Sequence, residues 1–236
     1  MIWARRRSGS AAVTWILEAT EGGGLDPQSL PWGASPKAAI VDLSAEPAPW
    51  AEALVGALVE RGAPVTLRVP GEAAVEIAGP LLPRGISVVR GLLPGEAGAP
   101  VARRCEALRP PMDRLRRLAA ARPRSAGALR VEVAATLSPE RLPELPILLL
   151  AVGPLKPRAL RIRFDGPVPE GLLPAVVEAL RCTAVEGRRL RCGLFVGGSG
   201  AISPALSVGP QAVEALGPAG SPDPGDGLIW RASPSP

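Results

Sequence analysis

The sequence of 236 residues contains no histidine and no tyrosine, and only two phenylalanines. Without imidazole the chain has no Ser-His or Cys-His catalytic pair, no histidine metal ligand and no ordinary proton shuttle for neutral pH. Lysine is also scarce: of 27 basic residues two, Lys37 and Lys156, are lysine, so 25 are arginine. This bias is typical of a GC-rich genome, so a single arginine carries little functional weight.

Cysteine is rare, with Cys105, Cys182 and Cys192 far apart in the chain. An odd number of widely spaced cysteines is typical of a reduced, cytosolic protein and not of a disulfide framework. The first 19 residues lack an apolar run long enough for a signal peptide, and no later stretch approaches a membrane span. We therefore expect a soluble, cytoplasmic protein without membrane contact and without a bound metal.

The net charge of +5 is concentrated between Arg103 and Arg130, where nine arginines stand against Glu106 and Asp113. We expect a solvated helix face there that contacts an acidic peptide or protein partner. The arginines expected at that contact are Arg103, Arg109, Arg114 and Arg117. Nucleic acid is the less favoured partner, because no aromatic residues are interleaved for base stacking.

Strand-like and helix-like segments alternate about six times, which predicts a parallel sheet covered by helices. The expected strands are 12–19, 38–44, 64–70, 86–90, 128–137 and 159–164. The expected helices are 47–63, 72–83, 100–122, 139–152 and 169–185. Gly62 is expected to end the first helix. Seven prolines are expected to break or shift several helix starts, namely Pro80, Pro83, Pro110, Pro111, Pro143, Pro146 and Pro174.

Several of these strands have one charged and one apolar face. In 64–70, for example, Thr66 and Arg68 alternate with Val65, Leu67 and Val69. Charge on a face covered by helices would be costly, whereas a barrel encloses a polar lumen. The predicted fold class is therefore α/β: a partial (βα)6 TIM-like barrel with mostly parallel strands and a short C-terminal β-hairpin.

Two stretches resemble radical SAM enzymes. VDLSAEPAPW (41–50) is similar to the strand and Gly-Gly-Glu-Pro turn that holds the methionine amine of S-adenosylmethionine in that family, with Ser44 and Ala45 in place of the glycines. AVTWILEATEGGG (12–24) resembles the family's first strand, but the loop after it lacks the three closely spaced cysteines that bind the [4Fe–4S] cluster. The resemblance, which covers roughly residues 12 to 205, implies a scaffold that has lost its radical chemistry.

A third stretch, RCGLFVGGSGAISPAL (191–206), resembles the hairpin of the SPASM or twitch extension in peptide-modifying radical SAM enzymes, with Ala205 where a second cysteine would follow Pro204. A phosphate loop is the alternative, but no Lys-Ser/Thr follows the glycines. We expect a hairpin remnant without a ligand. The predicted parts are a radical SAM-like partial barrel over 1–187, the hairpin remnant over 188–216, and an extended or disordered tail over 217–236.

Binding residues are expected at the carboxyl ends of the parallel strands. The candidates are Ser44, Glu46, Arg68, Arg90, Glu132 and Asp165. Arginines opposite carboxylates suit a zwitterion such as an amino acid, S-adenosylmethionine or a peptide terminus. In the alternative interpretation, arginines including Arg68 and Arg161 pair with Glu18, Asp42 and Glu132 and fill the space of a lost cofactor. We expect no bound cofactor, and S-adenosylmethionine is the less favoured possibility.

The predicted function is that of a catalytically inactive, radical SAM-like pseudo-enzyme. Such a subunit would pair with an active peptide-modifying enzyme, or present a precursor peptide to it. One alternative is a barrel hydrolase or lyase that uses Glu46, Glu132 and Asp165 as general acids and bases, although no spacing singles out a catalytic pair. The other alternative is a basic adaptor for nucleic acid.

Overall fold

The computed structural model describes residues 2–6, 13–18, 38–43, 50–93, 101–121, 129–164, 168–198, 213–216 and 227–231. The chain forms two compact units. The first unit consists of residues 1–92 and 110–131, and the second of residues 93–109 and 132–236. Helix α3 (Val101–Ala121) and strand β6 (Arg130–Leu137) each contribute residues to both units.

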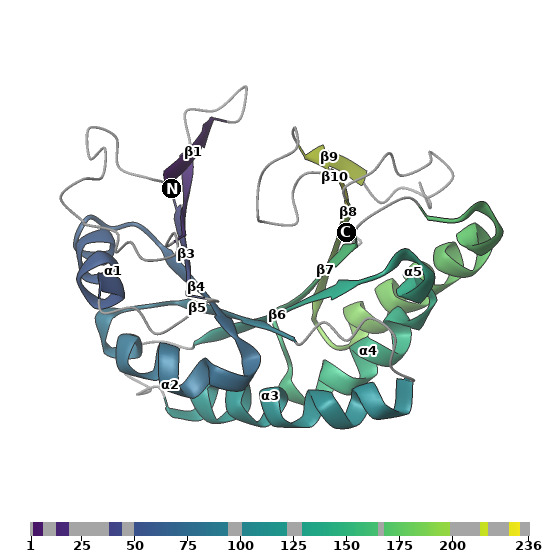
Figure 1. Ribbon diagram of the computed structural model, residues 1–236, viewed down its shortest axis with the longest axis horizontal. Helices are drawn as coiled ribbons and strands as arrows, with labels where there is room; N and C mark the ends of the chain where they lie inside the picture. The colour runs from purple at the N-terminus through teal and green to yellow at the C-terminus, as the bar shows by residue number, and fades with distance from the viewer. Residues whose placement is uncertain are drawn as a thin grey trace. The chain divides into compact units, whose positions relative to one another are not determined.

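The first unit contains five strands, of which four are parallel. These strands are β1 (Ile2–Arg6), β2 (Val13–Glu18), β3 (Ala38–Asp42), β4 (Val65–Pro70) and β5 (Val88–Leu92). Strand β1 pairs antiparallel with β2, and β2, β3, β4 and β5 pair in parallel in that order. Helices α1 (Trp50–Glu60) and α2 (Ala74–Ala78) cover one face of these strands (Figure 1). Short 3-10 helices, Gly71–Ala73 and Gly79–Arg84, flank α2.

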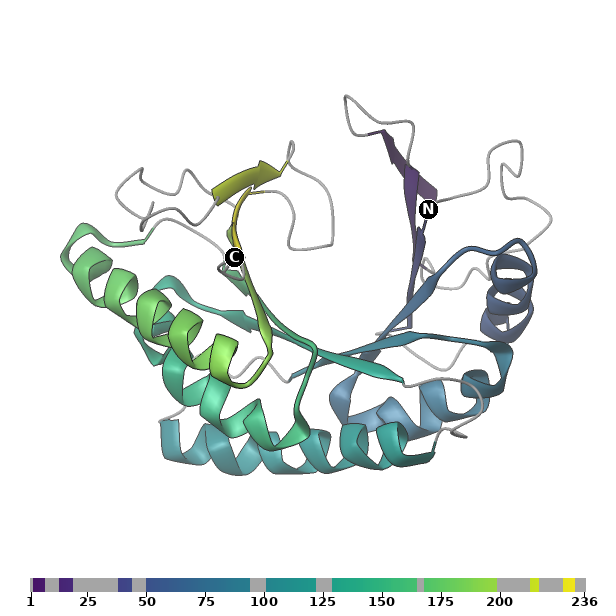
Figure 2. The same cartoon turned by 180° about the vertical axis from the view of Figure 1, so that it is seen from behind.

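The second unit has the same alternation of strands and helices. Its parallel strands are β6, β7 (Ala159–Phe164) and β8 (Gly193–Gly198). Helices α4 (Leu145–Val152) and α5 (Leu173–Arg189) lie side by side on one face of β7 and β8 (Figure 2). The 3-10 helices are Pro139–Glu144, Gly153–Leu155 and Glu170–Leu172. Strand β10 (Gly227–Arg231) pairs antiparallel with β8 and with β9 (Val213–Leu216).

The predicted fold class is confirmed, because the chain is α/β with mostly parallel strands that alternate with helices, which fits a partial TIM-like fold. Antiparallel pairing at the C-terminal end comes from β8, β9 and β10. Within the stretch 191–206, residues 193–198 form β8 and extend the parallel pairing of β7, while residues 199–206 lie outside the described residues. Strand β1 was not predicted.

Burial follows the predicted two-faced pattern. In β4, Val65, Leu67 and Val69 are buried whereas Thr66 and Arg68 are half-buried. In β7, Leu160 and Ile162 have no exposed surface at all. Each such aliphatic side chain contributes about 1.5–3 kcal/mol through removal from water. The apolar faces therefore hold the helices against the strands, and the polar groups lie on the opposite face.

The end of α1 is set by a local signal in the sequence, whereas the path of α3 through two prolines is stabilised by packing. Helix α1 ends where Gly62 adopts a φ of +74°, as predicted, and its N–H donates to the Val59 carbonyl. Helix α3 forms over nearly the whole predicted range and continues through Pro110 and Pro111. Pro111 packs closely on Gly71: a Cβ atom added at Gly71 would lie 2.8 Å from the Cβ atom of Pro111. This packing holds the helix in place despite two missing N–H donors.

Gly91 in β5 lets Leu115 of α3 approach the sheet. A Cβ atom at Gly91 would lie 2.5 Å from Leu115 Cδ1, and the Leu115 side chain is fully buried. Gly56 in α1 has no atom within 4 Å of an added Cβ atom. Gly91 and Gly56 therefore differ in what an added methyl group would meet.

We predict that Gly91→Ala destabilises the protein by about 1–3 kcal/mol, because the fully buried Leu115 side chain would have to shift to admit the methyl group. The same change at Gly56 should stabilise the protein by up to about 1 kcal/mol, since alanine is the better helix former. Urea unfolding followed by circular dichroism measures both values. Equal effects of the two substitutions would contradict the close packing of α3 on β5.

Candidate functional site

A row of four charged residues runs across the carboxyl ends of the parallel strands of the first unit. Its members, which we call the charged row, are Glu18, Asp42, Arg68 and Arg90. The strand register places Glu18 beside Asp42, Asp42 beside Arg68, and Arg68 beside Arg90. Hydrogen bonding between the strands therefore brings together residues that are up to 72 positions apart in the sequence.

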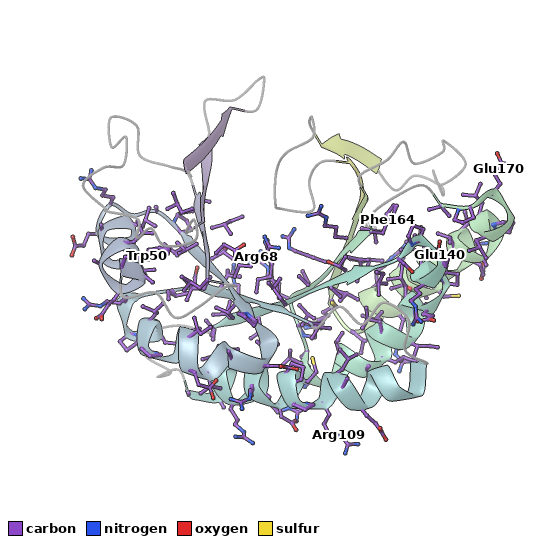
Figure 3. The ribbon with its side chains drawn as sticks, viewed as in Figure 1. Trp50, Arg68, Arg109, Glu140, Phe164 and Glu170 are labelled. Carbon is purple, nitrogen blue, oxygen red and sulfur yellow. The ribbon has the colours of Figure 1, made fainter. Side chains whose placement is uncertain are left out.

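The side chains of Asp42, Arg68 and Arg90 lie on the face of the strands that α1 and α2 leave free. Side chains alternate along a strand, so Val41 and Leu67, next to the row in sequence, point to the opposite face and have no exposed surface. Figure 3 shows Arg68 on the side of β4 away from α2. The carboxyl ends of parallel strands are the usual place for a binding site in α/β folds.

The middle of the charged row is an ion pair. Arg68 Nη1 lies 2.9 Å from Asp42 Oδ2, and their side chains are 20% and 8% exposed. Arg90 on the next strand is 4% exposed. Burial of a charge costs several kcal/mol unless an opposite charge and hydrogen bonds compensate for it. The pair is therefore a fixed arrangement of charge and not a mobile surface contact.

The second unit contains a similar ion pair. Arg161 Nε on β7 lies 2.8 Å from Glu132 Oε2 on β6, and the side chains are 17% and 9% exposed. Arg163, two residues further along β7, is half-buried on the same face. Each of these arginines alternates with the buried Leu160, Ile162 or Phe164 on the helix-covered face.

The structure describes only some of the predicted binding residues. It brings Arg68 and Arg90 together in the first unit and places Glu132, paired with Arg161, in the second. Both pairs, Arg68 with Asp42 and Arg161 with Glu132, agree with the interpretation in which charges compensate one another. The remaining candidates, which lie outside the described residues, are Ser44, Glu46 and Asp165.

The sequence did not indicate that the charged row shares one register. A signal was present, because Glu18 and Asp42 are each the last residue of a strand. Arg68 and Arg90 lie two residues before the ends of theirs. Which strands are neighbours and how far each is shifted along the next depends on the fold of the whole unit.

The arginines of α3 have different roles. Arg109 and Arg117 are exposed, and Arg109 points away from the helix in Figure 3. Arg114 pairs with Glu76 of α2 and thereby ties the two helices together. The backbone position of Arg103 is in the first turn of α3, and its side chain lies outside the described residues.

The described cysteines lie on separate elements and in different surroundings. Cys182 is exposed on α5 and donates a hydrogen bond to Glu178 Oε1 at 3.4 Å, which raises the pKa of its thiol. Cys192 precedes β8 and is buried, and burial raises the pKa of its thiol from 9.0 to about 11. At neutral pH the Cys192 thiol is therefore protonated and a poor nucleophile or metal ligand.

Comparison with known proteins assigns no family. No family profile matches the chain, and no curated protein matches it. In the part of the chain that the structure describes, no helix is both long and apolar enough to cross a membrane. Among the same residues, histidine, cysteine and acidic side chains form no group of three that could bind a metal.

We predict that Glu132→Gln costs about 2–4 kcal/mol of unfolding free energy, because it leaves the largely buried Arg161 guanidinium without its carboxylate. The matched control is Asp113→Asn, which removes a carboxylate 3.0 Å from Arg116 in a pair that is about half exposed. That change should cost less than about 1 kcal/mol. Denaturant titrations of both variants give the difference, and similar costs would contradict a buried, structural role for Glu132.

We also predict that the Cys192 thiol makes stability depend on alkaline pH. Below pH 9 the thiol is protonated in the folded and the unfolded chain, so it has no pH-dependent effect. Between pH 9 and about 11 only the unfolded chain loses the proton, which favours unfolding. Unfolding free energies measured across this range should therefore fall more steeply for the wild type than for Cys192→Ala, and parallel curves would refute this.

Proposed function

We propose that this protein is a non-catalytic subunit that binds a zwitterion, a free amino acid or the end of a peptide, at the charged row. It presents that ligand to an active partner enzyme. The observation that carries the proposal is the common register of Asp42, Arg68 and Arg90 on the helix-free face of the strands. The proposal includes a radical SAM enzyme as the partner, on the basis of the resemblance of residues 41–50. The resemblance of residues 191–206 is the reason for proposing a peptide-modifying one.

The order of charges in the row suits a zwitterion. The acidic positions are on β2 and β3, and the guanidinium groups are on β4 and β5. Neighbouring strands are about 4.8 Å apart, so Asp42 on β3 and Arg90 on β5 are roughly 10 Å apart across the sheet. An α-amino acid with one hydrogen bond of about 2.9 Å at each charged end has about this span. The ammonium group would lie toward Asp42 and the carboxylate toward Arg90, because a guanidinium group is a planar fork of donors that matches a carboxylate.

The chemistry of the chain supports a binding role over a catalytic one. The sequence has no histidine, and a protonated Cys192 thiol is a weak nucleophile. Glu132, a residue of the alternative hydrolase or lyase, is held by Arg161. On α3, Arg114 pairs with Glu76 and Arg116 pairs with Asp113. These pairs leave less positive charge on the helix for a nucleic acid.

The first test uses the purified chain and calorimetric titration with each of the twenty free amino acids and with S-adenosylmethionine. The best ligand is then compared with its N-acetyl and methyl ester derivatives, each of which lacks one charge. We expect the intact zwitterion to bind at least tenfold more tightly than either derivative and to be recovered chemically unchanged. Turnover of the ligand would refute the non-catalytic role, and equal affinities would refute recognition of a zwitterion.

A substitution in the charged row tests whether the ligand binds there. Arg90→Gln should weaken binding at least tenfold, because the amide cannot form the bidentate, charge-assisted contact with a carboxylate. Arg130→Gln is the matched control, since Arg130 is an exposed arginine of β6 and its substitution should leave the affinity unchanged.

The partner is tested separately by a tagged pull-down from the native host with measurement of iron. Recovery of this chain alone and free of iron would refute the partner while leaving the ligand test intact.

A further inference from the structure

The outer face of α4 and α5 in the second unit exposes apolar side chains. Of the residues that the structure describes, three large apolar side chains are exposed, Val185 at 65%, Leu150 at 59% and Ile147 at 43%, and all three lie on these two helices. The helices are in close contact, since Leu190 after α5 would lie 3.3 Å from a Cβ atom added at Gly153. The three exposed apolar side chains are therefore on two neighbouring helices of the unit.

Helix α5 carries a stripe of exposed residues through this region. The stripe consists of Glu178, Cys182, Val185 and Arg189. Their spacing of four, three and four residues is that of the contact seam between two packed helices. The opposite side of α5, including Val176, Leu180 and Thr183, is buried in the unit. The stripe thus has the spacing of a helix contact but no helix of the described chain against it.

The charges along the stripe are arranged so that two copies of it, placed antiparallel, would bring opposite charges together. The stripe begins with the acidic Glu178 and ends with the basic Arg189, with Cys182 and Val185 between them at equal distances from the midpoint. An antiparallel second copy of α5 would place its Arg189 opposite Glu178, and its Val185 opposite Cys182. A parallel copy would instead place acid against acid and base against base, which is unfavourable.

Ion pairs within α5 hold the two charges in position. Arg181 Nη1 lies 3.4 Å from Glu178 Oε2, and Arg189 Nε lies 3.3 Å from Glu186 Oε1. Glu178 and Arg189 side chains are 63% and 78% exposed, so each has room for a second partner from another molecule. In the antiparallel arrangement each charge would gain an opposite charge at one end of the contact while keeping its neighbour on the helix.

We propose that the α4–α5 face joins two copies of this chain in a two-fold symmetric dimer, with the two α5 helices antiparallel. Such a contact is isologous, because the same stripe serves both copies. Ile147 and Leu150 of each copy extend the apolar area beside the paired stripes. This surface is separate from the charged row, so the dimer does not depend on the proposed binding of a zwitterion.

A charge-swap experiment tests the dimer and its geometry. The association constant is measured by sedimentation equilibrium for the wild type, Glu178→Arg, Arg189→Glu and the double variant. Each single variant places like charges opposite each other and should weaken association at least tenfold, whereas the double variant should restore it. The control Glu170→Arg makes the same charge change one turn before the helix, at the exposed position labelled in Figure 3, and should have no effect.

Circular dichroism of each variant separates unfolding from loss of association. A monomeric wild type at all concentrations overturns the proposal, as does a dimer whose association is unaffected by the single variants. Cross-linking gives an independent measurement: a short bismaleimide should join two chains through Cys182, which lies near the two-fold axis, and Cys182→Ser should abolish the product. Failure of the folded dimer to cross-link would overturn the antiparallel alignment.

Discussion

The structure depends on the cost of placing charge on the inner positions of a sheet. Asp42 and Glu132 are almost fully buried, and neither carboxylate would be tolerated there without a compensating guanidinium. Arg68 and Arg161, each on the strand next to the acid, provide it at 2.9 and 2.8 Å. The same alternation that brings these groups to one face sends valine and leucine to the other, where they hold the helices. Pairing of charge and burial of apolar surface are therefore two consequences of one strand pattern.

This constraint also shapes what the first unit can bind. Acidic and basic residues do not alternate along the charged row. The two acidic residues, Glu18 and Asp42, are neighbours, and so are the two basic ones, Arg68 and Arg90. Neighbouring like charges repel each other, which strict alternation would have avoided. A separation of signs along one edge produces a local dipole, and a zwitterion is the ligand that such a dipole attracts. This is why we favour a binding site over a purely structural filling of the face.

Much of this could be predicted from the sequence, and the exceptions have physical causes. Alternation of apolar residues located β4 and β7 to within a residue of their ends, because the pattern is local. The packing that holds α3 at Pro111 could not be predicted, because the close fit of Pro111 on Gly71 joins segments that are 40 residues apart. The register that aligns Arg68 with Arg90 depends on hydrogen bonds between strands, so only the folded unit could reveal it. Strand β1 pairs with β2 and carries too little apolar pattern of its own to be recognised.

The ion pairs of this protein are of two kinds, buried pairs between strands and exposed pairs along α5. At Asp42 and Glu132 the partner comes from an adjacent strand and the pair is largely buried, so each pair contributes to the stability of the sheet whether or not a ligand is bound. On α5 the partners are three residues apart on one helix and largely exposed, so each pair contributes only a few tenths of a kcal/mol to the helix. Stability of α5 does not require charges in the order that it has, since any acid three or four residues from a base would serve. An order that is complementary to its own reverse, on the face where Val185 and Leu150 are exposed, is explained by contact with a second copy.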